Sequence, residues 1–295
     1  MTDLNRIVAT VALVCERHLP REVARRGRPP THAQALILQL IVVQYLHGLT
    51  SEAAFFRWLK RQPVLPWTIL PSRSQYNRRV KQLPALTAIL LPCIAQELDC
   101  HRERVRIIDS ASVPVVSYGL SDKSQRFPRG EQTNYGYCRT QNKRYYGCKL
   151  HLVTSKVGIP LHYELGPANE HDIQRLLSLG EWCRSGTFLL GDKGYWSGWR
   201  REYLKAGFGV TMLHPHRQGT QPNPVWAKRL LRKRRGNIET TFSQLKEQMG
   251  LERLRAKSYV GLEGRVAACL LAYVIGVRLN VRYRRPYRAI KSILL

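Results

Sequence analysis

The sequence predicts an α/β protein in which an N-terminal all-helical domain precedes a mixed sheet flanked by helices. Residues 1–100 carry apolar spacing typical of helices, and strand-like runs begin only near residue 104. From there strand-like and helical segments alternate, and two of the strand-like runs, 150–154 and 159–165, are joined by a short turn that contains glycine. A hairpin makes the sheet mixed and not purely parallel.

Two helices are expected before the prolines at positions 63, 66 and 71. The apolar residues between 35 and 46, interrupted by glutamines, predict a helix that is covered on most sides. Thr50, Ser51 and Glu52 form a start signal for a second helix over 52–60.

A short basic helix is expected after the prolines that follow. Either Ser72 or Ser74 is in position to cap it, and it carries Arg78 and Arg79. Helix, turn and basic helix is the layout of a helix-turn-helix module, so these arginines are candidate DNA contacts. The alternative is an ordinary helical domain whose charges face solvent.

An extended basic segment lies between the first apolar stretches. Arg26 and Arg28 flank a glycine and are followed by two prolines. Arginines in such a segment fit a narrow A·T-rich minor groove. The alternative is a basic turn that precedes Thr31, a plausible helix N-cap.

The second half of the chain is expected to order its elements as strand, hairpin, helix, strand, helix, strand and two helices. The residue patterns place these elements at 105–110, 150–165, 172–183, 188–192, 199–206, 209–213, 237–249 and 261–280. Asn237 is the expected N-cap of the penultimate helix, and Gly250 is its expected stop. The expected domains are residues 1–100, 101–260 and 261–295.

Residues 119–147 are expected to form a long polar loop in which basic and aromatic side chains are mixed. Basic groups such as Arg144, mixed with several tyrosines, suit a frayed or single-stranded DNA end on whose bases the rings stack. A flexible insertion is the alternative.

The net charge of the chain indicates which class of partner it binds. Its 295 residues hold 48 Lys plus Arg against 20 Asp plus Glu, a net charge of +28, which favours nucleic acid as the partner. The longest strongly apolar run covers residues 266–277, too short for a membrane span of about 20 residues. Seven cysteines without a C-x-x-C pair, and no secretory signal, indicate a reducing cytoplasm.

Three carboxylates stand out against this basic background. Asp109 and Asp192 each end an apolar strand-like run, on the same face as the apolar residues before them. If the two strands are neighbours, the two carboxylates repel each other unless a cation lies between them. Glu239, on a helix over the sheet, completes an oxygen-ligand set for Mg²⁺. Two such ions activate an attacking oxygen and stabilise a leaving one in phosphodiester chemistry.

The helix that carries Glu239 also presents Phe242 and Lys246 on the same face. Lys246 is therefore a candidate contact to the phosphate backbone. Glu247 and Glu252 are rival third carboxylates, one on a different helical face and the other past Gly250.

Several further residues are weaker candidates. Lys193 and Tyr195 follow Asp192 and are candidate DNA contacts, while His171 and Asp172 are candidates to assist near the metals. A cap role at a helix start is the alternative for Asp172. Trp196 and Trp199 are candidates to stack on a flipped base, with a place in the core as the alternative.

Five segments together resemble the DDE transposases of bacterial insertion sequences, most closely the IS982 family, over roughly residues 30–282. They are 107–110, 147–152, 166–172, 190–195 and 238–246, which include Ile-Ile-Asp-Ser, Gly-Asp-Lys-Gly-Tyr and Ile-Glu-Thr-Thr-Phe. The Glu239 helix also resembles the Y-(2)-R-(3)-E-(6)-K signature of the related IS4 group. Arg235, Glu239 and Lys246 match that signature, whereas Arg232 stands at the tyrosine position, so end processing by that tyrosine is not implied.

The resemblance implies an RNase H-like fold, with Asp109 on the first strand, Asp192 on the fourth and Glu239 on the following helix. It implies cutting at terminal inverted repeats and attack of the freed 3′-hydroxyl on target DNA, with two Mg²⁺ ions, or Mn²⁺ in their place. The expected partner is double-stranded DNA, namely the inverted repeats and the target, bound by a homodimer in a bacterial, nucleoid-associated setting and not at a membrane. Arg235 is a candidate DNA contact.

Two other functions fit the same residues. One is a helix-turn-helix regulator whose C-terminal part has no catalytic role, against which the intact Asp109, Asp192 and Glu239 argue. The other is an RNase H-fold nuclease that cuts without joining, which would use the same site.

Overall fold

The computed structural model describes residues 3–20, 32–121, 125–138, 142–216, 219 and 222–293. The chain forms two compact units, one of residues 1–94 and 244–295 and the other of residues 95–243. These units do not coincide with the three expected domains. Residues 244–295 belong with the N-terminal helices, because the last long helix is part of their core.

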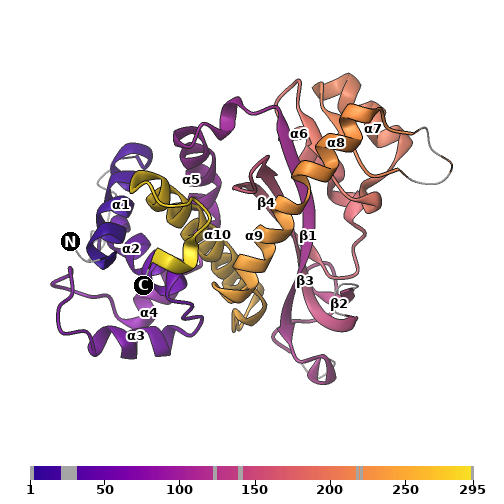
Figure 1. The fold of residues 1–295 in the computed structure, drawn as a ribbon. Coiled ribbons are helices and arrows are strands. Elements are labelled where there is room, and N and C mark those ends of the chain that lie inside the picture. The colour runs from indigo at the N-terminus through magenta and orange to yellow at the C-terminus, as the bar shows by residue number, and fades with distance from the viewer. Residues whose placement is uncertain are drawn as a thin grey trace. The chain divides into compact units, whose positions relative to one another are not determined.

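The unit of residues 95–243 is built on one six-stranded mixed sheet (Figure 1). Its strands are β1 (Val105–Val116), β2 (Asn134–Cys138), β3 (Lys143–Ser155), β4 (Pro160–Pro167), β5 (Phe188–Leu190) and β6 (Thr211–Leu213). Strand β1 pairs antiparallel with β3 and parallel with β5, and β5 pairs parallel with β6. Both β2 and β4 pair antiparallel with β3. The mixed sheet flanked by helices, and the hairpin that makes it mixed, are therefore confirmed.

The predicted loop over 119–147 is largely wrong. It contains β2 and the start of β3, together with the 3-10 turn η2 (Tyr118–Leu120). Tyr145 and Tyr146 are buried in the sheet, so these aromatics stabilise strand pairing and are not available for stacking on DNA. Because β2 adds a strand, Asp192 follows the fifth strand of the chain and not the fourth.

Helices cover the sheet on both faces. Alternation along β1 sends Ile108 to one face and Ile107 to the other. Ile108 packs with Leu176, Leu179 and Leu204 of the helices on its side, in a core that also holds Tyr195. The elements on that side are η3 (Asp172–Arg175), α6 (Leu176–Glu181), η4 (Lys193–Tyr195) and α7 (Gly198–Phe208).

Helix α9 (Gly236–Glu247) lies along the sheet beside β1 and β4 (Figure 1). Two hydrogen bonds fix its first turns to the turn between β3 and β4. The Asn237 amide donates to the Lys156 carbonyl at 2.8 Å, and the Thr241 hydroxyl donates to the Gly158 carbonyl at 2.6 Å. Asn237 therefore lies inside the helix, where its side chain anchors the sheet, and it is not the expected N-cap.

A basic helix precedes α9. Helix α8 (Val225–Arg234) ends where α9 begins, and it was not among the expected elements. Gly250 adopts a left-handed conformation, with φ of 68°, shortly after α9 ends. This is the conformation that a helix stop favours in glycine, so its predicted role is confirmed.

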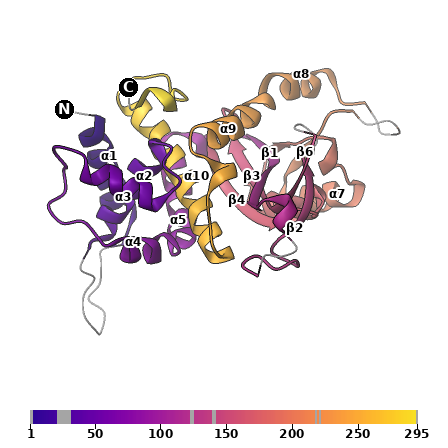
Figure 2. The same cartoon turned by 90° about the horizontal axis from the view of Figure 1, so that it is seen from below.

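The other unit is all helical, as expected for the N-terminal region. Its helices are α1 (Asp3–His18), α2 (Gln34–Leu46), α3 (Glu52–Lys60), α4 (Arg73–Val80), most of α5 (Leu83–Glu97) and α10 (Tyr259–Arg282). Helix α10 packs against α1, α2 and α4 and lies alongside α2 (Figure 2). Two short 3-10 turns, η5 (Leu251–Arg253) and η6 (Ile290–Ile293), complete this unit.

Helix α10 is longer than the apolar run of residues 266–277, which was judged too short to span a membrane. It is long and apolar enough to cross a membrane by length and composition alone, but 89% of its most apolar window is buried inside the protein. Burial on this scale is typical of a core helix, and α2, with nine consecutive buried residues, is its main partner.

The basic helix was predicted at α4, and its cap is resolved between the two candidates. Ser72 accepts a hydrogen bond from the backbone N–H of Gln75 at 3.2 Å, and the Gln75 side chain accepts from the Ser72 N–H at 2.8 Å. This is a capping box. Helices α3 and α4 are joined by residues 61–72, a connection longer than the roughly 3–4 residues of a helix-turn-helix.

Candidate active site

Asp109 and Asp192 lie at the same level on two neighbouring parallel strands. Ile107 of β1 pairs with Leu190 of β5. Extending this register by two residues places Asp109 opposite Asp192, just past the end of β5. Residues that are opposite each other in a sheet point to the same face, so the two carboxylates face the same side.

The surroundings of Asp109 are unfavourable to a lone negative charge. Burial raises the pKa of its carboxyl to about 7, although a hydrogen bond from the Ser110 N–H at 2.9 Å opposes this rise. The nearby Asp192 and Asp172 carboxylates raise the pKa further, and Arg235 lowers it. A carboxyl in such surroundings is stable either when it is protonated or when a cation lies beside it.

Asp192 is held at the start of the 3-10 turn η4. Its Oδ1 accepts a hydrogen bond from the Gly194 N–H at 2.7 Å. The next residue, Lys193, is exposed, as a DNA contact requires. Tyr195 is fully buried in the core against Ile108, which rules out the direct DNA contact considered for it.

Glu239 projects from the first turn of α9 and is the most exposed of the three carboxylates, with 60% of its side chain accessible. Its Oε1 lies 3.7 Å from a guanidinium nitrogen of Arg235, one turn earlier in the chain. Because Arg235 also acts electrostatically on Asp109, this arginine is the positive group shared by the two acids.

The donor set fits magnesium in chemistry. Mg²⁺ is bound through one or two carboxylates, with waters and substrate phosphates filling the other positions. The Asp109–Asp192 pair has this composition, and a cation beside it would offset the burial that raises the pKa of Asp109. Among the residues that the structure describes, no three His, Cys, Asp or Glu side chains lie close enough together to hold a metal ion, so Glu239 is not assembled with the pair.

Lys246 is partly engaged within the protein. Its ammonium lies 2.8 Å from Glu252 Oε1, and only 22% of its side chain is accessible. A phosphate contact by Lys246 therefore has to compete with this ion pair. Glu252, a rival third carboxylate, is the partner in that pair.

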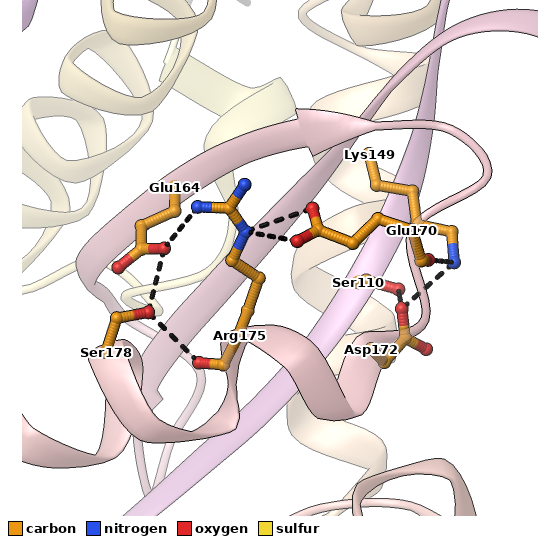
Figure 3. A network of polar contacts seen from close by, with 7 residues as sticks. All are labelled: Ser110, Lys149, Glu164, Glu170, Asp172, Arg175 and Ser178. Atoms are coloured by element: carbon orange, nitrogen blue, oxygen red, sulfur yellow. Dashed lines mark hydrogen bonds and ion pairs between the residues drawn. The ribbon is translucent and has the colours of Figure 1, made fainter. Parts of the chain in front are cut away.

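On the face of β1 opposite Asp109, the side chain of Ser110 belongs to a polar network (Figure 3). The Ser110 hydroxyl donates to Asp172 Oδ1 at 2.9 Å, and Lys149 Nζ lies 3.1 Å from the same oxygen. Strand β1 continues past Asp109 to Val116, so this acid lies inside the strand and not at its expected end. His171 and Asp172 were expected to assist near the metals, but the roles of Ser110 and Lys149 were missed. Their only sequence signal was membership of the motifs 107–110 and 147–152.

Exposed cations form a second class of candidate residues. Arg144 at the start of β3 and Arg78 on α4 are exposed, whereas Arg79 is partly buried and hydrogen-bonded to Gln34. Arg26 and Arg28 lie outside the described residues. On α8, four exposed cations were missed as individual contacts: Lys228, Arg229, Arg232 and Lys233. Trp199 of α7 is 60% exposed, with Arg200 over its ring at 4.6 Å, while Trp196 is half-buried.

The helical unit contains a pocket of about 510 Å³ between α3 and the start of α4. Its apolar lining includes Phe56 and Pro71, and its charged lining consists of Arg57, Lys60 and Arg73. The lining contains no acidic residue. The pocket therefore combines an apolar lining with three positively charged side chains.

The chain was compared with protein families, curated proteins and solved structures. A family model described as "Transposase DDE domain" matches residues 101–275. The comparison with curated proteins found no match. Among solved structures, a piggyBac transposase in a synaptic complex with hairpin DNA is similar, at 12% sequence identity and a TM-score of 0.49. That alignment covers 99% of this chain and 75% of the other.

Proposed function

The chain belongs to the Transposase DDE domain family, and from this premise we propose that it cleaves the ends of an insertion sequence and joins them to target DNA. The family match spans Asp109, Asp192 and Glu239, so the proposed chemistry and the candidate site occupy the same part of the chain. The finer assignment to the IS982 family rests on the sequence motifs.

The observation that carries the proposal is the paired position of Asp109 and Asp192. Two carboxylates at one level of a parallel strand pair, one with a pKa raised to about 7, form a site prepared for a cation. Asp109 and Asp192 would hold divalent metal, with Glu239 as the third carboxylate. When bound, Mg²⁺ or Mn²⁺ supplies activation of the attacking oxygen and stabilisation of the leaving oxygen.

The chain's own residues have distinct tasks in this proposal. The Gly194 N–H orients Asp192, and the Ser110 N–H orients Asp109. Arg235 lies 3.7 Å from Glu239 and acts electrostatically on Asp109, so its guanidinium is suited to a phosphate oxygen near both acids. Lys193 and the cations of α8 would bind the DNA backbone near this site.

Recognition of the DNA ends is proposed for the helical unit. Arg78 and the three cations of the α3–α4 pocket are the exposed groups that support it, and Arg26 and Arg28 keep the minor-groove role expected from their sequence. The substrate would be double-stranded DNA with inverted repeats. The active complex would be a homodimer, in a bacterial cytoplasm.

The test is the substitution Asp192→Asn, with nicking of a supercoiled plasmid measured in Mn²⁺ or Mg²⁺. The substitution removes a ligand charge but preserves shape, so cleavage should be abolished while DNA binding in a gel shift stays nearly unchanged. Asp109→Asn and Glu239→Gln should behave alike, and double variants should be scarcely worse than single ones. Glu181→Gln, at an exposed position on α6, is the matched control. Cleavage by Asp192→Asn within about tenfold of the unsubstituted protein would exclude this site.

A further inference from the structure

Ser110 connects the two faces of strand β1. Its backbone N–H donates to Asp109 Oδ1 at 2.9 Å, on the side of the candidate metal site. Its hydroxyl points to the opposite face, because side chains alternate along a strand, and donates to Asp172 Oδ1 at 2.9 Å. Any shift of the Ser110 side chain is therefore transmitted to the group that orients Asp109.

Asp172 is itself fixed by Lys149. The Lys149 ammonium donates to Asp172 Oδ1 at 3.1 Å and to the Glu170 carbonyl oxygen at 2.7 Å. Lys149 pairs with Ser112 across β1 and β3, which places it on the same face as Ser110. The lysine thus joins the strand that precedes the hairpin turn to the segment that carries Asp172.

The segment around Asp172 is braced from its other end. Arg175 Nε lies 2.9 and 3.0 Å from the two carboxylate oxygens of Glu170, and Arg175 Nη1 lies 3.2 Å from Glu164 Oε2 on β4 (Figure 3). These contacts hold the 3-10 turn η3 against the sheet. Only 22% of the Asp172 side chain is accessible, so its position is well determined by protein contacts.

The hydroxyl of Tyr195 provides an independent observation. It is buried and has no hydrogen-bond partner among the described residues. After burial, the groups that act on it electrostatically are Asp172, Asp109 and Asp192. Through this buried hydroxyl, Asp172 and the Asp109–Asp192 pair belong to one polar region that spans both faces of the strand.

We propose that Asp172, held by Lys149, is a positioning residue that acts through Ser110 to orient Asp109 for metal and substrate. This inference rests on the proposed function and assigns a role to residues on the face of the sheet opposite the candidate metal site. Partners in the outer shell of a metal site orient the ligands, and their loss costs about 10–100-fold in metal affinity or activity.

The experiment compares Asp172→Ala, Asp172→Asn and Ser110→Ala in the full-length protein. Mn²⁺ affinity is measured without DNA by electron paramagnetic resonance, and plasmid nicking is measured at saturating Mn²⁺. Asp172→Ala and Ser110→Ala should each weaken Mn²⁺ binding or slow nicking by about 10–100-fold, with DNA affinity unchanged. Asp172→Asn keeps an acceptor for Ser110 and should recover much of the loss.

A double-variant cycle separates positioning from general stability. Because Asp172 acts through Ser110, the combined Asp172→Ala and Ser110→Ala variant should be little worse than either alone. Glu181→Gln is the matched control, since Glu181 is exposed at the end of α6 and is not one of the residues of this network. It should leave Mn²⁺ binding and nicking unchanged.

Failure of this inference is distinct from failure of the proposed function. If Asp172→Ala does not fold, as judged by circular dichroism, Ser110→Ala and Asp172→Asn carry the test. Wild-type Mn²⁺ affinity and nicking in Ser110→Ala would overturn the positioning role while leaving Asp192→Asn inactive. Strictly additive losses in the double variant would also overturn it.

Discussion

Asp109 illustrates how a single residue is tuned by its place in the sheet. The same side chain in solvent would ionise near pH 4, whereas here burial is the largest of the causes that raise its pKa to about 7. Its Ser110 hydrogen bond and the nearby Arg235 favour the charged form but do not offset burial. The charged form of this half-buried residue therefore carries a cost, which either a bound proton or a nearby cation relieves.

Metal binding should depend on pH in the direction that this pKa sets. A metal ligand must lose its proton, so Mn²⁺ affinity should rise about tenfold per pH unit below about pH 7 and level off above it. Titration of the full-length protein with Mn²⁺ between about pH 5.5 and about pH 8.5 measures this. In Asp109→Asn the remaining dependence should be much weaker, and an unsubstituted protein with equal affinity at both ends of the range would contradict the assignment.

The same group contributes to stability with the opposite sign. The folded pKa is raised above the unfolded value, so the folded state binds the proton more tightly and is stabilised at low pH. This contribution is lost as pH rises from about 4 to about 7 and stays absent above. Without metal, Asp109→Asn should therefore raise the Tm at about pH 8 and change it little at about pH 4, as calorimetry would show. A lower Tm for the variant at about pH 8 would contradict this.

At the scale of elements, one buried ion pair joins three helices of the helical unit. Glu52 at the start of α3 accepts from Arg265 of α10 and from Asn77 of α4, the latter at 2.8 Å. Arg265 also donates to the carbonyls of Thr50 and Leu254, at 3.2 and 3.1 Å. Only about a tenth of each charged side chain is accessible, at 11% for Arg265 and 10% for Glu52.

Glu52→Ala should be strongly destabilising, because it leaves the Arg265 charge buried without its acid. Loss of one partner from a buried pair costs about 3–5 kcal/mol, measurable by urea denaturation. The control is Arg102→Ala, which breaks a pair of exposed side chains with Asp99 and should cause no measurable change. An equal effect of the two substitutions would show that Arg265 is satisfied by its two carbonyls.

At the scale of the whole molecule, the net charge of +28 sets the expected response to salt. If about 6–10 phosphates are contacted, affinity for a duplex should fall by roughly 10³–10⁵ between about 50 and about 200 mM salt. Fluorescence anisotropy with a labelled duplex measures the slope. A nearly flat slope would mean that the basic surface is solvated and does not bind DNA.

The division of the chain into units also predicts how fragments behave. A fragment of residues 1–100 lacks α10, against which α2 packs, so it should expose α2 and lack a cooperative unfolding transition. Calorimetry of this fragment beside the full-length chain tests the point. A sharp transition in residues 1–100 alone would show that α10 is dispensable for the helical core.

The sequence by itself determined the features that depend on neighbours along the chain. The hairpin of β3 and β4, the start of the strand that carries Asp109, a serine cap for α4 and the stop at Gly250 all follow from local apolar spacing and turn residues. The motifs around Asp109, Asp192 and Glu239 predicted a DDE transposase domain, which the family match confirms, while the IS982 assignment stays a prediction.

Only the tertiary structure decided the features that depend on distant segments. Strand β2 forms because β3 offers it an edge, which no local pattern in residues 119–147 reveals. Helix α10 joins the N-terminal helices because its apolar surface is buried all round, whereas a sequence pattern does not name its partner. The hydrogen bond between Ser110 and Asp172 connects residues 62 positions apart. It forms because η3 packs against the face of β1 that carries the Ser110 side chain.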